Sequence, residues 1–178
     1  NWIVGHDSIG WGKYLNLNNT NAEASDSTVW QNTAPTNSVV TTNSTFIYNT
    51  GSTIVAYCFA EKQGYSKFGS YTGNGNADGT FVYLGFKPAF LLWKDTSNTM
   101  NWGIFDNKRD TFNEVENFVK PNLNDAEAAG DYQIDFLSNG FKIYNANGFS
   151  NNSGDTYIYM AFAEAPLVGT NNVPCTAR

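Results

Sequence analysis

The sequence predicts an all-β protein, an antiparallel β-sandwich built from an internally repeated unit of about 103 residues. Aromatic residues make up 16% of the 178 residues and charged residues only 15%, a composition that suits half-buried pleated sheets. Short apolar runs alternate with turn-forming Gly, Asn, Ser and Thr, which indicates many short strands. One β-rich segment occurs twice, as GSTIVAYCFAE at 51–61 and as GDTYIYMAFAE at 154–164.

Other matches extend this repeat in the same order along the chain. Asn1-Trp2 recurs as Asn101-Trp102, and Ala22-Glu23-Ala24 recurs as Ala126-Glu127-Ala128. Three ordered matches, each about 100 residues apart, predict an internal duplication with small insertions in its loops.

The duplication divides the chain into three parts. Residues 1–62 are predicted to be the C-terminal part of a first repeat unit, 63–166 a complete second unit, and 167–178 a polar C-terminal tail. The first two parts are compatible with one globular body. Because the first copy lacks a counterpart of the front of the second, we expect the chain to be a piece of something longer.

Residues at matching positions are predicted to be structural anchors. The tryptophans are expected in the core, and each glutamate is expected to accept hydrogen bonds at the rim of a sheet, with a pair of matched ligand sites as the alternative. The anchors are Trp2, Trp102, Phe59, Phe162, Glu61 and Glu164.

Individual strands follow from the apolar runs. Residues 54–60 and 157–163 are nearly all apolar, which predicts strands covered on both faces. Residues 81–86 and 89–93 flank Lys87-Pro88, where a continuous ladder is excluded. Ser138-Asn139-Gly140 predicts a hairpin. Short helices are expected only at 111–119 and 125–129.

Charge and hydropathy exclude two classes of partner. The net charge is −6 with ten Lys and Arg, and no basic stripe occurs, so no nucleic-acid binding is expected. No apolar run approaches the roughly 20 residues of a membrane span, so no membrane insertion is expected. Cys58 aligns with Ala161, which predicts a free cysteine in the core rather than a bridge to Cys175.

Two groups of motifs carry a resemblance to a known family. The first is GYSKFGSYTGNG at 64–75 with DG at 78–79 and FVYLGFKP at 81–88, and the second is DFLSNGFK at 135–142 with YIYMAFAE at 157–164. They are similar to the repeated domain of uncharacterised function in tail-fibre and tail-spike-like proteins of marine bacteriophages, including cyanophages, and of related prophages. The resemblance covers nearly the whole chain.

This resemblance implies a setting rather than a mechanism. It implies a non-catalytic, extracellular virion module of a phage tail fibre, with a lectin-like or jelly-roll-like sandwich, that recognises a host cell-surface glycan or protein. Other tail or fibre subunits are implied partners, and a trimer is the implied assembly. A purely structural spacer or packing domain is one alternative, and a polysaccharide depolymerase is another.

Aromatic residues are the candidates for glycan binding, because their faces offer broad apolar area with a polar handle. Trp11 and Trp30 lie among small polar residues and have no evident counterpart in the second copy. We predict that they stack on a glycan, together with Tyr65 and Tyr71.

One loop is a candidate metal site. Asn74, Asn76 and Asp78 place side-chain oxygens at alternate positions, as hard-cation loops do, so Ca²⁺ is a possible cofactor. The loop lacks the further carboxylates of a dedicated site, and a plain tight turn explains the same residues. No other cofactor is expected.

Two arrangements raise catalytic hypotheses. His6-Asp7-Ser8 has the residue types of a triad, but neighbours along a strand point to opposite faces. A glycosidase would need a pair of carboxylates across a cleft. No pair stands out among Asp106, Asp110, Glu114, Glu116, Asp131 and Asp135, so no catalytic residue is predicted.

Overall fold

The computed structural model describes residues 1–42, 53–130, 132–146 and 148–164, and strands dominate its regular structure. A single 3-10 turn, η1, occurs in these ranges at Asp7–Ile9. The strands are β1 (Ile3–Val4), β2 (Lys13–Asn16), β3 (Ala24–Ser25), β4 (Ser66–Thr72), β5 (Phe81–Tyr83), β6 (Phe90–Asp95), β7 (Gly103–Asp106), β8 (Ile134–Leu137), β9 (Gly140–Ile143) and β10 (Thr156–Phe162).

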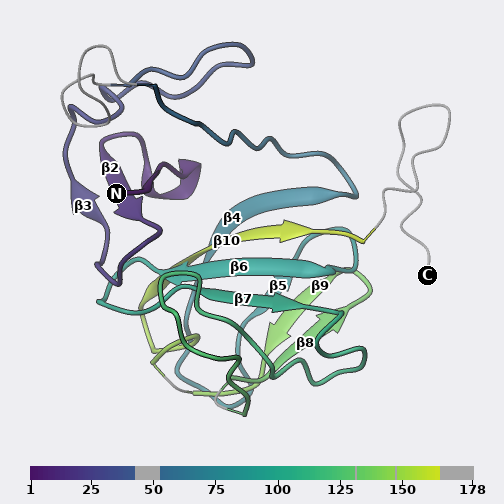
Figure 1. The fold of residues 1–178 in the computed structure, drawn as a ribbon. Helices are drawn as coiled ribbons and strands as arrows, with labels where there is room; N and C mark the ends of the chain where they lie inside the picture. Colours follow the sequence, from purple (N-terminus) through teal and green to yellow (C-terminus); the bar gives the residue numbers. More distant parts are fainter. Residues whose placement is uncertain (43–52, 131, 147, 165–178) are drawn as a thin grey trace, which may run out of the picture.

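All strand pairs are antiparallel, which confirms the predicted all-β class. A four-stranded sheet has the order β4-β10-β6-β7, a three-stranded sheet the order β5-β9-β8, and an N-terminal sheet the order β1-β2-β3. In Figure 1 the four long strands lie side by side, and β8 and β9 cross behind them. The hairpin predicted around Ser138-Asn139-Gly140 is present between β8 and β9.

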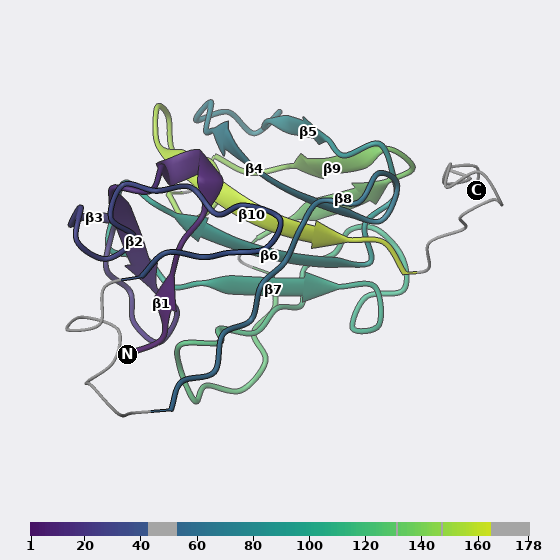
Figure 2. The same cartoon turned by 90° about the horizontal axis from the view of Figure 1, so that it is seen from above.

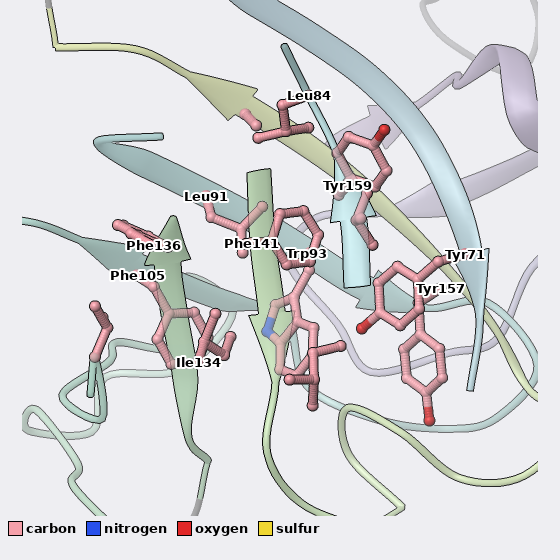
Figure 3. Packing of buried hydrophobic residues seen from close by; sticks show 14 of the residues in the cluster. Tyr71, Leu84, Leu91, Trp93, Phe105, Ile134, Phe136, Phe141, Tyr157 and Tyr159 are labelled. Carbon is pink, nitrogen blue, oxygen red and sulfur yellow. The ribbon is translucent and has the colours of Figure 1, made fainter. Parts of the chain in front are cut away.

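The main core lies between the four-stranded and the three-stranded sheets. Alternate residues of each strand point into it, and Trp93 of β6 is at its centre in Figure 3. The Trp93 ring stacks on Tyr157 at 6.1 Å and meets Phe105 edge-on at 5.5 Å. Phe141 and Ile134 contribute from the opposite sheet. Each such side chain contributes about 1.5–3 kcal/mol by burial.

A second, smaller core lies on the outer face of the four-stranded sheet. Ile9 and Leu15 of the N-terminal part pack there on Trp102 and Ile158, and Trp102 Nε1 donates to the carbonyl of Asn16 at 2.9 Å. Trp102 is therefore the core residue that its position in the sequence predicts. In Figure 2, β1, β2 and β3 gather at one end of this sheet, and β2 and β3 lie at the same end in Figure 1.

The segment 107–133 contains no helix among its described residues, so the helices expected at 111–119 and 125–129 are wrong. Isolated antiparallel bridges hold the segment instead, pairing Ile104 with Val119 and Phe118 with Ala128. Phe118 and Val115 are buried against the main core. Tertiary packing of these apolar residues overrides the weak local helix signal.

The first copy of the repeated segment differs most from expectation. Residues 54–60 were predicted to be a strand, but residues 53–61 form no strand and are exposed. The exposed fractions of Trp2 and Phe59 are 54% and 57%, so these two residues are not core anchors. Cys58 is exposed and free, so its prediction as a core residue is also wrong. The cause is the absence, among the described residues, of strands on either side of this segment.

Two predicted features lie outside the described residues. They are Cys175 and the tail at 167–178. Phe162 at the end of β10 is half-buried.

Gly103 allows Trp93 to occupy the core, which yields a stability prediction. A Cβ at Gly103 would lie 2.0 Å from Trp93 Nε1, and Trp93 is fixed by the rings around it. We expect Gly103→Ala to lower the free energy of unfolding by about 1–3 kcal/mol through overpacking, measured by urea denaturation. Gly148→Ala is the control, since its Cβ would meet nothing closer than 3.7 Å. Equal stability of the two variants would contradict the prediction.

Candidate interaction surfaces

Trp11 and Trp30 do not form an exposed stacking surface. Trp30 is buried, with 8% of its surface exposed, and Trp11 packs edge-on against it at a ring separation of 5.7 Å. Both rings also lie on the backbone of Gly5, where a Cβ would come within 2.7 Å of Trp11. Burial of its ring makes the glycan-stacking prediction wrong for Trp30, whereas for half-buried Trp11 stacking stays a prediction.

The two predicted tyrosines are also engaged inside the protein. Tyr71 is buried, stacks on Tyr157 at 5.0 Å and donates its hydroxyl to the carbonyl of Ser150 at 2.8 Å. Tyr65 is half-buried and packs edge-on against Phe162 at 5.7 Å. Tyr71 is therefore excluded as a glycan contact, because it lies on the inward face of β4.

The loop at 74–78 is a hydrogen-bonded turn tied to Asn151. Asn74 Oδ1 accepts from Asn76 N at 2.9 Å and from Asn151 Nδ2 at 2.8 Å. The carboxylate of Asp78 pairs with Lys142 Nζ at 2.6 Å. The oxygens of Asn74 and Asp78 are thus used within the protein. Among the described residues no group of three or more His, Cys, Asp and Glu side chains is placed to hold a metal ion.

The triad-like residues are used separately. His6 Nε2 donates to the carbonyl of Tyr159 at 3.2 Å, and His6 Nδ1 accepts from the Ser8 amide. Asp7 accepts instead from Trp11 Nε1 at 3.1 Å. Burial lowers the pKa of His6, although the hydrogen bond to Tyr159 opposes this shift. His6 therefore caps η1 and contacts the sheet.

Two of the carboxylates considered for hydrolysis, Asp106 and Asp110, hold backbone amides of nearby turns. Asp106 Oδ1 accepts from the amides of Lys108 and Arg109, both at 2.9 Å. Asp110 Oδ2 accepts from the amides of Glu116 and Asn117. Asp131 lies outside the described residues. These contacts fix turns and give no carboxylate pair across a cleft.

The repeated glutamates lie at the rim of the four-stranded sheet. Glu61 Oε1 accepts from the amide of Phe68 on β4 at 3.0 Å. Glu164 contacts Lys108, and Asn107 Nδ2 donates to it at 3.2 Å. The hydrogen bond from Lys108 is the largest cause of the lowered pKa of Glu164. Both contacts fit the predicted role of an acceptor at a sheet rim.

An open aromatic surface, which sequence reasoning missed, lies on the outer face of the three-stranded sheet. Phe81 and Tyr83 point outward from β5 on either side of buried Val82, and 60% of the surface of Tyr83 is exposed. Lys67 Nζ lies over the Tyr83 ring at 5.5 Å, and Lys142 pairs with Phe81 across the strands. Burial alternates along residues 81–83, but all three residues are apolar, so residue type alone does not identify this face.

A larger apolar surface lies on the outer face of the four-stranded sheet. Phe59 contacts Phe68 of β4 at 6.4 Å and Phe162 of β10 at 5.9 Å. Upstream, the Tyr57 ring stacks on Trp2 at 6.0 Å, and 69% of the surface of Tyr57 is exposed. In Figures 1 and 2 this segment runs from the N-terminal strands across to the start of β4. The exposed apolar side chains here are Trp2, Ile54, Val55, Tyr57 and Phe59.

One hollow is too small to hold a ligand of sugar size. Its volume is about 130 Å³, well below the several hundred Å³ of a typical ligand pocket. Lys87, Phe112 and Phe136 are among its lining residues. Asp110 also lines it, but the Oδ2 atom of Asp110 already accepts from the amides of Glu116 and Asn117.

Lys94 is the most unusual ionisable group. It is 1% exposed, and its Nζ donates to the carbonyls of Asp95 and Asn98. Burial lowers its pKa from 10.5 to about 8, although the negative charge of Asp95 acts to raise it. Its two carbonyl acceptors belong to the turn after β6, so Lys94 fixes that turn.

The lowered pKa of Lys94 predicts how stability changes with pH. Between pH 8 and 10.5 the unfolded chain holds the Lys94 proton and the folded chain releases it, so stability increases with pH over this interval. We expect a gain of roughly 1–3 kcal/mol, measured by urea denaturation from pH 7.5 to 9.5, below the range where tyrosines ionise. Lys94→Met is expected to remove the slope. A flat or falling profile for the parent protein would contradict the prediction.

Comparison with known proteins gives one match. No curated protein and no solved structure matches the chain, and the part of the chain that the structure describes has no helix that is long and apolar enough to cross a membrane. Residues 1–166 match a family described as a domain of unknown function, DUF7483. Since that match includes both the four-stranded and the three-stranded sheets, the chain belongs to the DUF7483 family.

Proposed function

We propose that this chain is a non-catalytic structural module of an extracellular phage tail fibre, in which repeated sandwich units pack one against the next. The phage setting rests on the motif resemblance. The structural role rests on one observation, namely that the N-terminal part and the segment 102–134 contain the same residue pairings at matching positions.

The strand pairings support the repeat. Val4 pairs with Leu15, and Ile104 pairs with Val119. Tyr14 pairs with Ala24, and Phe118 pairs with Ala128. Val4 and Ile104 are 100 residues apart, as Trp2 and Trp102 are. The other matched positions are 104 residues apart, as Ala24 and Ala128 are.

Side-chain contacts repeat as well. The amide of Trp2 donates to Asn18 Oδ1 at 2.8 Å, and the amide of Trp102 donates to Asn122 Oδ1 at 3.0 Å. His6 Nδ1 accepts from the amide two residues on, as Asp106 Oδ1 does. A chance likeness of strands would not preserve such polar contacts.

The repeat also accounts for the tryptophans that the sequence left without counterparts. Trp11 and Trp30 contact one another, and the residues at the corresponding places, Val115 and Ile134, form an isolated bridge. Both pairs are internal contacts between the same two parts of a unit. This correspondence favours a structural role over glycan binding for Trp11 and Trp30.

The proposal of a structural role predicts a location in the particle. Antibodies raised against the chain should label the tails of phage particles produced by cells that carry the gene, as seen by immunogold electron microscopy. Particles from cells with the gene deleted serve as the control. Labelling that is absent from intact and from disrupted particles would contradict a virion role.

The open face of the three-stranded sheet favours a second candidate function, recognition of a host-surface glycan. Phe81 and Tyr83 offer ring faces for sugar stacking. Lys142 pairs with Phe81 and with Asp135 across the sheet, so a polar residue that also contacts Asp78 and the carbonyl of Gly79 adjoins the rings. This arrangement is a better candidate for glycan binding than the residues predicted from the sequence.

The glycan candidate has its own test. If the chain binds a glycan on an array, Tyr83→Ala is expected to weaken that binding about tenfold, because it removes a stacking ring. Phe112→Ala is the control, since Phe112 is exposed but is not part of this sheet. Equal losses in the two variants, or no binding to any glycan, would contradict the candidate.

A further inference from the structure

We infer that residues 53–61 are a sheet strand that is completed by a second copy of the front half of the repeat unit, through strands equivalent to β4 and β6. The inference rests on the internal repeat of the proposed function and goes beyond it by naming the partner. The partner is a strand pair with the sequence of residues 63–100.

The segment has the side-chain pattern of a strand covered on both faces. Its counterpart β10 points Tyr157, Tyr159 and Ala161 into the main core, and all three are buried. Ile54, Ala56 and Cys58 occupy these positions in the first copy, and Val55, Tyr57 and Phe59 occupy the alternate ones. An uninterrupted apolar run is typical of a strand buried on both faces and not of an exposed connection.

The backbone of the segment lacks the neighbours that β10 has. Every residue of β10 pairs with a residue of β4, and most also pair with β6. In the described ranges, by contrast, no strand pairing includes any of residues 53–61. Its contacts with β4 come from its last residues. The ring of Phe59 packs on Phe68, the carbonyl of Ala60 accepts from Ser66 Oγ at 3.0 Å, and the side chain of Glu61 accepts from the amide of Phe68. The one backbone bridge to β4 here is made by the next residue, Lys62, with Ser66.

The N-terminal strand has the same deficit. In the complete unit β6 lies between β7 and β10. The first copy has the counterpart of β7 in residues 3–6, where β1 pairs only with β2, and the counterpart of β10 in residues 53–61. In the part of the chain that the structure describes, no β6-like strand lies between them. Trp2 and Tyr57, one on each side of that position, stack on each other and stay largely exposed.

These observations also select the occupant. A strand between the counterparts of β7 and β10 needs apolar residues on both faces, as β6 has in Leu91, Leu92 and Trp93. A β4-like strand would cover the second edge of the segment. The residues 63–100 contain both strands and end immediately before the matched Asn101-Trp102. A copy of them placed ahead of Asn1-Trp2 therefore reproduces the order of the complete unit.

Cys58 is a direct probe of completion. It aligns with Ala161, which is fully buried between β4 and β6, whereas Cys58 is exposed. In a Cys175→Ser background Cys58 is the single thiol of the chain. We compare this protein with a version in which a second copy of residues 63–100 is fused ahead of Asn1, and measure the rate of thiol modification by a disulfide reagent.

The expected result is that the fusion slows modification of Cys58 about 100-fold or more, because a buried thiol reacts only through local opening. Amide hydrogen exchange over residues 53–61 should slow in parallel. The matched control carries Leu91→Pro and Trp93→Pro in the added copy, which break its β6 strand, and should leave Cys58 as reactive as in the parent.

Three outcomes overturn the inference. The first is an unchanged rate of Cys58 modification in the fusion, whether or not the added copy folds. The second is equal protection of Cys58 by the control fusion. The third is protection of Cys58 in the parent chain without any added copy, either at high protein concentration through self-association or on addition of lipid vesicles. If antibodies label phage tails but Cys58 stays unprotected in the fusion, the strand partner is rejected and the virion role is not. If Cys58 is protected in the fusion but antibodies do not label phage tails, the virion role alone is rejected.

Discussion

The packing of the Trp93 indole on the backbone at Gly103 is the contact on which the rest of the sheet arrangement depends. Trp93 is 1% exposed, and its indole lies where a side chain at Gly103 would otherwise stand. From there its ring reaches Tyr157 of β10 and Phe149 in the loop before β10. The indole nitrogen has no hydrogen-bond partner among the described residues, so shape and apolar area, and not a polar contact, hold this residue in place.

The polar turns complement this apolar centre. Asn151 is buried and joins the turn after β4 to the turn before β10, because its Oδ1 accepts from Asn74 N and its Nδ2 donates to the carbonyl of Asn76. The many asparagines of the sequence thus satisfy backbone groups at the ends of strands that aromatic residues bury. Glycine at positions such as 73 and 79 lets these turns approach one another closely.

The sequence predicted the all-β class and the hairpin at 138–140, since apolar pattern and turn residues act locally. It also predicted strands at 81–86, 89–93 and 157–163, although the first of them ends at Tyr83. It failed at residues 54–60, where the local pattern is the same but the described part of the chain provides no neighbouring strands. Strand formation depends on partners distant in sequence, which a local pattern does not report. It failed for Trp30 because polar neighbours do not reveal that its ring packs on Trp11 and on the backbone of Gly5. It missed the open face with Tyr83 because residues 81–83 are all apolar and only their burial in the structure alternates.

The contrast between the two copies connects sequence, stability and assembly. One apolar segment is central in a sheet as β10, and the other lies on the surface with Val55, Tyr57 and Phe59 in contact with solvent. An exposed apolar strand is a hazard for aggregation unless a specific partner covers it. Glu61 reduces that hazard at one point by accepting the free amide of Phe68 at the edge of β4. In the described part of the chain, no such contact covers the backbone of residues 53–59. The apolar sequence of this segment is therefore better explained by a requirement to pair with another strand than by a requirement for solubility.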